Sequence, residues 1–339
     1  MCVLGTVPNA QADAVRDFYK GKNVQLILGA AVGGSYDLYG RAVGRHIWRH
    51  IPGKPRLIVQ NRNGAGSQVA AGYVFNVAPQ DGTVIAGLLN TLAIRQAVGR
   101  TRKTFDVAKF NWIGNITDDV TVLTLWNAAT KARTVDDLRK TEVIAGATTS
   151  TGLSATIPKA MNYALGTKLK VVSGYKGGAG VDHAMERGEV AVRAGANWSV
   201  VANKHPDWIK ENKITIVVQV GSKRAKGLEN VPLMHELARN DEERKILEFF
   251  TTPMDMGKPY AVGPKVPAAR IKALRAAFDA MTKDPVFNAD AKKLGLVISP
   301  VGGADLQKLV TDIANSPKSV TEVANKIFGK PKKRKKKKM

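Results

Sequence analysis

Three short segments rich in glycine and hydroxyl side chains carry most of the residues that could bind a ligand. They are residues 29–37 (G-A-A-V-G-G-S-Y-D), 147–154 (A-T-T-S-T-G-L-S) and 173–180 (S-G-Y-K-G-G-A-G). Each follows an apolar run and precedes a helical pattern, so its backbone N–H groups lie at the positive end of a helix dipole. Glycines let a ligand approach these groups closely, and an anion such as a carboxylate is the ligand that they favour.

The polar residues of these segments also have ordinary structural explanations. Ser35 and Asp37 suit a helix cap and the negative charge of a first helical turn. The hydroxyls of residues 147–154 could supply one N-cap while the others face solvent. In the third segment Tyr175 could line a pocket and Lys176 could attract an anion, or the segment could be a flexible turn with an exposed lysine. Three such segments, each after a strand, favour a binding site more than one alone does.

The sequence contains no familiar arrangement of catalytic residues. It lacks the G-x-S-x-G, H-E-x-x-H and G-x-G-x-x-G patterns and the G-K-[ST] phosphate loop. His46 and His50 have the spacing that can hold zinc, but Arg45 and Arg49 would repel a cation, and no nearby carboxylate or thiol completes a site. We therefore predict no catalytic residues, no metal and no cofactor.

The charge of the chain favours an anionic partner. The net charge is +24 over 339 residues, and eight of these positive charges lie in residues 330–338, which leaves +16 for the rest. Aromatic residues make up only 6%, which argues against a platform that stacks nucleic-acid bases. The single cysteine, Cys2, excludes an intramolecular disulfide framework. No apolar run is long enough to predict a membrane-spanning helix.

The two ends of the chain differ in character from its body. Residues 10–12 and 12–14 both read small-x-small, as at a signal-peptidase site. Residues 1–19 are therefore interpreted as the remnant of a signal peptide or an N-terminal arm, with a frayed cytosolic terminus as the alternative. Residues 330–339 form a Lys/Arg-rich block that we expect to be disordered, because like charges repel. A solvated tail without an assigned role is favoured there over a nucleic-acid or lipid binder.

Apolar runs alternate with helical patterns along the body of the chain. This alternation predicts an α/β fold with mostly parallel sheets covered by helices. No low-complexity linker divides the chain, so we expect it to cross between two lobes on ordered segments, at residues 112–126 and 252–263. Strands are predicted at 24–28, 56–60, 83–89, 121–126, 142–145, 169–173, 189–193, 214–219 and 259–263, and C-terminal helices at 267–282, 285–294 and 304–327. A helix at 153–165 is expected to be interrupted near Pro158.

Several motifs occur in an order that is typical of one protein family. They are L-I-L-G-A-A-V-G-G-S-Y-D-L-Y-G-R, V-Q-N-R-N-G-A-G-S-Q-V-A-A, A-P-Q-D-G-T-V-I-A-G, Y-K-G-G and R-G-E-V-A-V. Together they resemble the Bug receptors of tripartite tricarboxylate transporters, over a stretch from Asp17 to about Ile327. The resemblance implies a two-lobe type II periplasmic-binding-protein fold with two interlobe crossings, which closes on a small carboxylate.

The resemblance also implies which residues bind the ligand. In this family backbone amides, short hydroxyls and water hold the carboxylate, mainly in strand-to-helix loops. The ligand-binding positions carried over are Gly33, Gly34, Ser35, Asp37, Asn90, Thr91, Thr149, Ser150, Thr151, Tyr175, Gly178 and Asn197. Residues 195–197 (G-A-N) stand where many members have an Asp-Asn pair, so the identity of the ligand does not follow from the family.

We therefore expect a periplasmic solute-binding protein, not an enzyme, that delivers a small carboxylate to the permease of a tripartite tricarboxylate-type transporter. It is expected to act as a monomer and to bind no specific nucleic acid. The predicted domains are residues 20–124 with 258–329 (domain I) and 125–257 (domain II). The alternatives are an α/β enzyme acting on a small carboxylate, or a nucleic-acid-binding protein that uses the basic tail.

Overall fold

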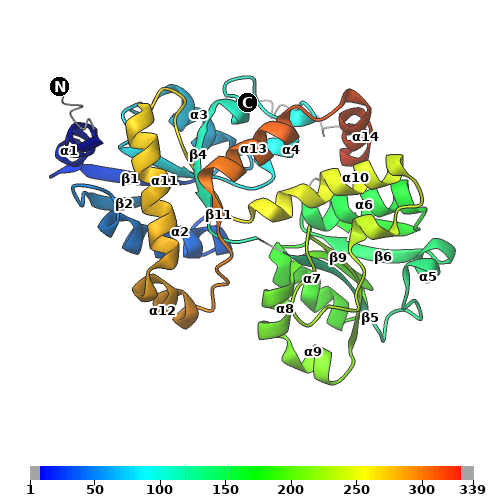
Figure 1. Cartoon of the computed structure of the whole chain (residues 1–339). Coiled ribbons are helices and arrows are strands. Elements are labelled where there is room, and N and C mark those ends of the chain that lie inside the picture. Colours follow the sequence, from blue (N-terminus) through cyan, green and yellow to red (C-terminus); the bar gives the residue numbers. More distant parts are fainter. Residues whose placement is uncertain (1–7, 119, 151, 330–339) are drawn as a thin grey trace, which may run out of the picture. The chain divides into compact units, whose positions relative to one another are not determined.

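The computed structural model of the chain describes residues 8–118, 120–150 and 152–329 (Figure 1). These residues form two compact units. Unit 1 contains the described residues up to 118 and residues 255–315. Unit 2 contains the described residues between 120 and 254 and those from 316 to 329. Within the described residues, no helix combines the length and apolar character needed to cross a bilayer.

The sheet of unit 1 brings together strands from both ends of the chain. Strand β1 lies between β2 and β3 and is parallel to both, while β10 pairs antiparallel with β3 and β4. The carboxyl ends of β1 and β3 therefore meet at one edge of the sheet. In spatial order the strands are β11 (Val301–Gly302), β4 (Asn111–Asn115), β10 (Pro259–Val262), β3 (Val84–Gly87), β1 (Asn23–Leu28) and β2 (Arg56–Asn61).

Helices cover this sheet and bury its apolar residues. The β1 side chains of Leu26 and Leu28 are buried in one core with Tyr260 of β10 and Phe278 of α11. The hydroxyl of Tyr39 donates to the carbonyl of Val297, 258 residues later, at 3.1 Å. The helices are α1 (Pro8–Tyr19), α2 (Ser35–His46), α3 (Gln68–Asn76), α4 (Leu92–Ala97), α11 (Ala268–Lys283), α12 (Pro285–Lys293) and α13 (Gly303–Ala314).

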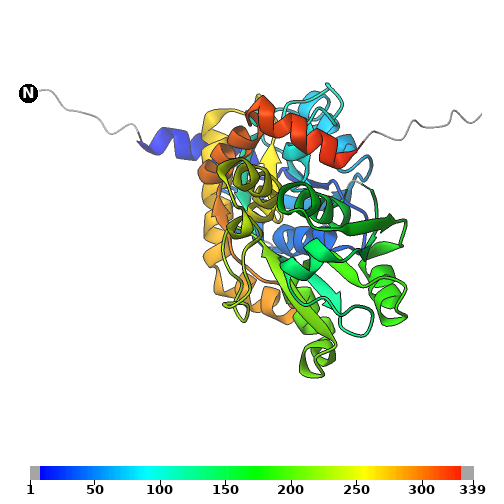
Figure 2. The same cartoon turned by 90° about the vertical axis from the view of Figure 1, so that its right-hand side faces the viewer.

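Residues 8–19, which lie in the predicted N-terminal arm, form helix α1 as part of unit 1. Helix α1 lies beside α11 in both views (Figures 1 and 2). Val15 and Tyr19 are buried in the core, and the Tyr19 hydroxyl donates to the carbonyl of Gly82 at 3.1 Å. Both small-x-small tripeptides lie within this helix. The structure thus differs from the expected arm over residues 8–19, because these apolar side chains have a core to enter.

Unit 2 contains a five-stranded sheet with the same kind of edge. Strand β6 is parallel to its neighbours β7 and β8, whereas β5 is antiparallel to β8 and β9. The carboxyl ends of β7, β6 and β8 therefore lie side by side. In spatial order the strands are β7 (Leu169–Ser173), β6 (Val143–Ala147), β8 (Val192–Asn197), β5 (Thr121–Trp126) and β9 (Ile214–Val220). The helices are α5 (Val135–Lys140), α6 (Leu153–Leu165), α7 (Gly177–Glu186), α8 (Trp198–Lys204), α9 (Pro206–Lys210), α10 (Asp241–Thr251) and α14 (Lys318–Phe328).

The chain passes between the units three times rather than twice. Two passages, after 118 and after 254, fall within the two predicted crossing segments, and the third falls after 315. The third exists because α14 packs on α6 and α10, where the Phe328 ring lies 5.7 Å from that of Phe250. Unit 2 thus includes β5 and α14, parts of which the sequence analysis placed in domain I, since β5 pairs with β8 and β9.

Three local predictions differ from the observed elements. The strand predicted at 189–193 is β8, which begins at Val192 and includes residues 195–197. The helix predicted at 304–327 is two helices, α13 and α14, separated at Pro317. The interruption predicted near Pro158 is wrong: α6 continues to Leu165 because its buried residues hold it against the sheet. The predicted basic tail at 330–339 lies outside the described residues.

Candidate functional site

The first predicted binding segment in unit 1 connects β1 to α2. Gly34 is the N-cap of α2 in an extended conformation, and no side chain caps the helix there. A Cβ atom built on Gly34 would meet only the carbonyl oxygen of Ala31, at 3.7 Å. Ser35, the first residue of the helix, is exposed. This helix end therefore has an open approach for an anion.

Asp37, a predicted ligand-binding residue, is instead engaged within its own unit. Its carboxylate is buried and accepts hydrogen bonds from the Gly33 N–H (3.0 Å), Arg41 Nε (3.0 Å) and Asn61 Nδ2 (2.8 Å). Burial alone would raise the pKa of Asp37, but these three hydrogen bonds hold it below its ordinary value. Asp37 thus holds the loop in place and occupies the Gly33 N–H, which is then not available to a ligand. Its ion pair with Arg41 compensates its charge.

Asn90 and Thr91, which the resemblance assigns to the site, lie at the strand end next to this segment. They follow β3, the strand next to β1, and the N–H of Asn90 donates to the Tyr36 hydroxyl at 3.1 Å. The ammonium group of buried Lys258 lies 4.6 Å from the centre of the Tyr36 ring. Unit 1 therefore brings together its six predicted site residues, from Gly33 to Thr91.

The N-G-A-G-S motif forms a loop of unusual backbone conformation between β2 and α3. Four consecutive residues, Gly64 to Ser67, have positive φ angles, and two of them are not glycine. Ser67 is fully buried, and its Oγ accepts a hydrogen bond from the N–H of Leu89 at 3.3 Å. A Cβ on Gly29 would lie 1.8 Å from this Oγ, which explains glycine there. The motif therefore places a hydroxyl between the ends of β1 and β3.

In unit 2 the hydroxyl-rich segment after β6 forms its own turn. The Thr149 hydroxyl accepts a hydrogen bond from the N–H of Gly152 at 3.0 Å. The carbonyl of Ser150 accepts one from Lys159 Nζ at 3.0 Å, and the Ser154 hydroxyl accepts one from the N–H of Thr148 at 3.2 Å. Among the described residues no side chain caps α6, whose N-cap is Gly152, so the capping interpretation is wrong and these hydroxyls hold the turn itself. Thr151 lies outside the described residues.

Tyr175 and Gly178 lie at the next strand end and reveal an arginine that the sequence analysis missed. The N–H of Tyr175 donates to the carbonyl of Ala147 at 3.3 Å, which joins the ends of β7 and β6. A Cβ on Gly178 would lie 2.6 Å from Nη2 of Arg193, a β8 residue with 13% of its side chain exposed. The one sequence signal for Arg193 is a charged residue inside an otherwise apolar strand.

Arg193 is paired with an acidic residue of the same unit. It forms an ion pair with Asp182 of α7, whose side chain is 9% exposed. Burial lowers the pKa of Arg193 to about 10. His205 Nε2 lies 3.6 Å from Asp182, and the imidazole stacks on Trp208 with the ring centres 3.8 Å apart. Burial and the nearby Arg193 charge both lower the pKa of His205.

Asn197 ends β8 and caps the helix that follows. Its side-chain oxygen accepts hydrogen bonds from the N–H (3.1 Å) and the hydroxyl (2.7 Å) of Ser199. Asn197 also lies at the same sheet edge as the segments after β6 and β7. Unit 2 therefore gathers its described predicted residues at neighbouring strand ends, although Thr149 and Asn197 already have structural hydrogen bonds.

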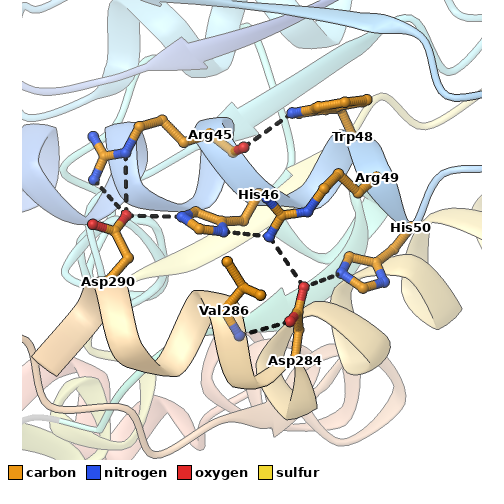
Figure 3. A network of polar contacts seen from close by, with 8 residues as sticks. All are labelled: Arg45, His46, Trp48, Arg49, His50, Asp284, Val286 and Asp290. Carbon is orange, nitrogen blue, oxygen red and sulfur yellow. Dashed lines mark hydrogen bonds and ion pairs between the residues drawn. The ribbon is translucent and has the colours of Figure 1, made fainter.

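His46 and His50 belong to an ion-pair network, not to a metal site (Figure 3). His46 Nε2 and Arg45 Nη2 lie 2.8 Å and 2.9 Å from the Asp290 carboxylate. His50 and Arg49 contact Asp284 in the same way, at 3.0 Å and 3.1 Å. The expectation that no carboxylate lies nearby is therefore wrong, because α12 supplies two. Among the described residues, no group of three or more metal-ligating side chains occurs.

This network fastens α12 to the helix that carries the Gly34–Ser35 end. Asp284 has a pKa of about 2, lowered first by the N–H of Val286 and further by Arg49 and His50. Asp290 has a lowered pKa, chiefly because of its hydrogen bonds with His46 and Arg45. Both carboxylates are therefore held in the charged form that these hydrogen bonds require.

Solved structures with this fold were found by comparison. No family model and no curated protein matches the chain. A TctC solute-binding protein from Polaromonas has a TM-score of 0.70 and 18% identity, covering 91% of this chain and 99% of its own. The periplasmic binding protein BugD has a TM-score of 0.61 and 18% identity, with 91% and 98% covered. The R. palustris protein Rpa4515, solved with adipate, has a TM-score of 0.61 and 17% identity, with 91% and 97% covered.

These similarities concern the fold of nearly the whole described chain. The two-lobe α/β fold expected from the sequence is confirmed, and so is the resemblance to TctC and Bug proteins at the level of the fold. Sequence identity of 17–18% leaves the function to be argued from the residues of this chain.

Proposed function

We propose that the chain is a solute-binding protein that captures a small organic carboxylate. The observation that carries this proposal is the open N-terminus of α2 at Gly34 and Ser35. There, no side chain among the described residues caps the backbone N–H groups, and the Ser35 hydroxyl is exposed. A 12-residue helix adds positive potential at that point, so a carboxylate is the natural ligand. The adipate bound to Rpa4515, which has the same fold, supports this class of ligand.

Binding without chemical turnover fits the local chemistry. The carboxylate of Asp37 is held by three hydrogen bonds, and the Ser67 hydroxyl is buried at a strand end. Neither is placed as a nucleophile beside a general base. We therefore expect any carboxylate that binds to be released unchanged, and a turnover assay on that ligand separates the binding protein from an enzyme.

The proposal extends to where the protein works and what it works with. We propose that it acts outside the cytoplasmic membrane as a monomer and delivers its ligand to the permease of a tripartite tricarboxylate-type transporter. The fold shared with TctC and BugD supports this role. Fractionation of cells that express the full reading frame tests the location, and the protein is expected in the periplasmic fraction. Recovery from the cytosol alone would contradict it.

The decisive experiment is a thermal-shift screen of mono-, di- and tricarboxylates, followed by titration calorimetry. A ligand present at about 100 times its dissociation constant should stabilise the protein by about 2.7 kcal/mol. Gly34→Leu should abolish this binding, because its side chain covers the N–H groups at the start of α2. The matched control is Gly302→Leu at the N-cap of α13, where a Cβ meets only Asp279, at 3.9 Å.

The two variants make the result interpretable. Both should fold with urea midpoints close to wild type, since neither Cβ meets a close neighbour. Loss of binding in Gly34→Leu alone supports the proposed site. Unchanged affinity in Gly34→Leu means that the site lies elsewhere, and no stabilisation of the wild type by any carboxylate rejects the proposed function.

A further inference from the structure

A groove of about 680 Å³ lies in unit 1 between the C-terminal half of α2 and strand β2. Leu57 and Val59 of β2 supply its apolar lining, and both are only half-buried. A Cβ atom on Gly44 of α2 would lie 2.5 Å from Cγ2 of Val59, so glycine there lets the helix approach the strand closely. The volume falls within the range of about 300–1,000 Å³ that is typical of binding sites.

Strand β2 has one open backbone side along this groove. Among the described residues it pairs with β1 alone, at the end of the sheet. The N–H groups of Arg56 and Arg62 donate to carbonyls on the β1 side, at 2.9 Å and 2.8 Å. Because alternate residues of a parallel strand direct their backbone groups to opposite sides, Leu57 and Val59 direct theirs away from β1. Another extended chain could pair with these groups.

The charged groups that line the groove are cations, and no acidic side chain of the described residues lines it. The cations are Arg41, Arg45, Lys54 and Arg56. The two arginines of α2 have acidic partners, Asp37 and Asp290. Lys54 and Arg56 are exposed, and within the described part of the chain neither forms an ion pair. They leave a net positive charge at the groove, which favours an acidic partner.

Trp48, in the short turn that follows α2, adds an aromatic wall to the groove. It is half-buried, and its Nε1 donates to the carbonyl of Arg45 at 2.9 Å, which holds the indole in place (Figure 3). Tryptophan and arginine are both enriched where proteins bind one another. The groove thus combines an apolar lining, an aromatic wall and cations beside open backbone groups.

The cations beside β2 also have a protective explanation. Lysine, proline and other charged residues at an edge strand discourage unwanted pairing, and Lys54, Pro55 and Arg56 fit that role. The two explanations are compatible, because a positive edge repels a basic strand and attracts an acidic one. The same charges that prevent unselective pairing therefore select the partner.

We propose that this groove binds an acidic, extended segment of another protein, which adds as a strand to the open edge of β2. Its backbone pairs with Leu57 and Val59, its apolar side chains contact Trp48, and its carboxylates lie near Lys54 and Arg56. The inference does not rest on the proposed function, since the carboxylate ligand was placed at the first residue of α2 and the groove lies along the other half of that helix.

The test measures the fluorescence anisotropy of labelled peptides with the full-length chain at about 0.15 M salt. The probe is E-V-E-V-E-V-E. The comparisons are K-V-K-V-K-V-K, of opposite charge, and E-P-E-V-E-P-E, which has the same charge but cannot form a regular strand. Wild type should bind the probe at least tenfold more tightly than either comparison.

Two double variants locate the binding. Lys54→Gln with Arg56→Gln should weaken binding of the probe at least tenfold. Arg102→Gln with Lys103→Gln removes one arginine and one lysine that are also exposed but lie outside the groove lining, and should change it less than twofold. Urea midpoints close to wild type for both double variants exclude misfolding as the cause of lost binding.

The remaining outcomes overturn the inference. If the probe does not bind, or the proline peptide binds equally well, β2 does not accept a strand. If both double variants weaken binding equally, the peptide follows net charge, including that of the basic tail. Binding to anionic phospholipid vesicles that only the groove variant loses, without binding of the probe, assigns the groove to a membrane surface instead. Carboxylate binding in the screen should be unchanged in both variants, so failure here leaves the proposed function standing.

Discussion

Each unit has an arginine packed against a glycine near the edge of its sheet, but the two arginines are in opposite electrostatic states. In unit 2 Arg193 lies against Gly178 and is paired with Asp182. In unit 1 Arg95 lies against Gly66, and no acidic residue of the described chain pairs with it. The position of a guanidinium is thus not enough to assign its role. A guanidinium that the protein itself neutralises holds a loop in place, whereas one left unneutralised is available to an anion.

The largest expected effect comes from removing the partner of Arg193. Asp182→Ala would leave a buried guanidinium without a counter-charge and should destabilise the protein by about 3–5 kcal/mol. Arg95→Gln removes a cation that has no partner and should change stability by less than about 0.5 kcal/mol. Urea unfolding followed by circular dichroism measures both values. Equal losses of stability in the two variants would contradict the conclusion that Arg193 has a counter-charge and Arg95 has none.

A smaller effect is expected at Asp37, the residue whose charge is compensated within unit 1. Asp37→Ala leaves Gly33, Asn61 and Arg41 without their acceptor and should lose about 1–3 kcal/mol. The loss should be near the lower end, because the Arg41 side chain is 43% exposed and water can solvate it. The same unfolding assay measures it, and a loss as large as that of Asp182→Ala would contradict the weight given to the burial of Arg193, which is 13% exposed against 43% for Arg41.

The stability contributed by Asp37 should also depend on pH in one direction. Its folded pKa lies below the ordinary value of 3.8, so the contribution is complete above that value and is lost as the pH falls through the folded pKa. The difference in the free energy of unfolding between wild type and Asp37→Ala, measured at a series of pH values from 6 downward, isolates the contribution of Asp37. A difference that grows on acidification would contradict it.

The smallest effect is expected in the titration of His205. Its pKa is lowered by burial and then by Arg193, while Glu186 and Asp207 act in the opposite direction and Lys204 in the same direction. Arg193→Met should therefore raise the pKa of His205, as measured by NMR of the imidazole protons. Arg95→Gln, in the other unit, should leave it unchanged. A lowered pKa also means that the wild type gains stability as the pH rises towards 6.5.

The sequence predicted the elements whose apolar pattern is continuous. Residues 121–126 were predicted as a strand and form β5 with the same bounds, because all six side chains are buried. The position of β8 was missed because Gly195 and Ala196 carry too little apolar surface to mark a strand. The break at Pro317 was missed because the apolar helical pattern continues across it, and only the packing of α14 on unit 2 separates the two helices.

The candidate site was predicted as positions along the chain, but not as contacts. The glycine and hydroxyl segments were recognisable because strand-to-helix loops have a local signature. Asp37 suited both a ligand site and a first helical turn, and its partner Asn61 is 24 residues away, beyond any local pattern. Arg95 carries no local signal, and the one signal for Arg193 is a charged residue inside an otherwise apolar strand. Whether an arginine has an acidic partner depends on how strands and helices pack, and this information is not present in any short segment.

The third passage of the chain, after residue 315, has a consequence for the order in which the protein can assemble. Unit 1 needs β10 and α13, and unit 2 needs α14, so each core remains incomplete until segments near the end of the chain have been synthesised. Contacts such as the one between Tyr39 and Val297 close loops of more than 250 residues, and a high contact order slows folding. A growing chain can therefore complete neither core until most of its synthesis is over.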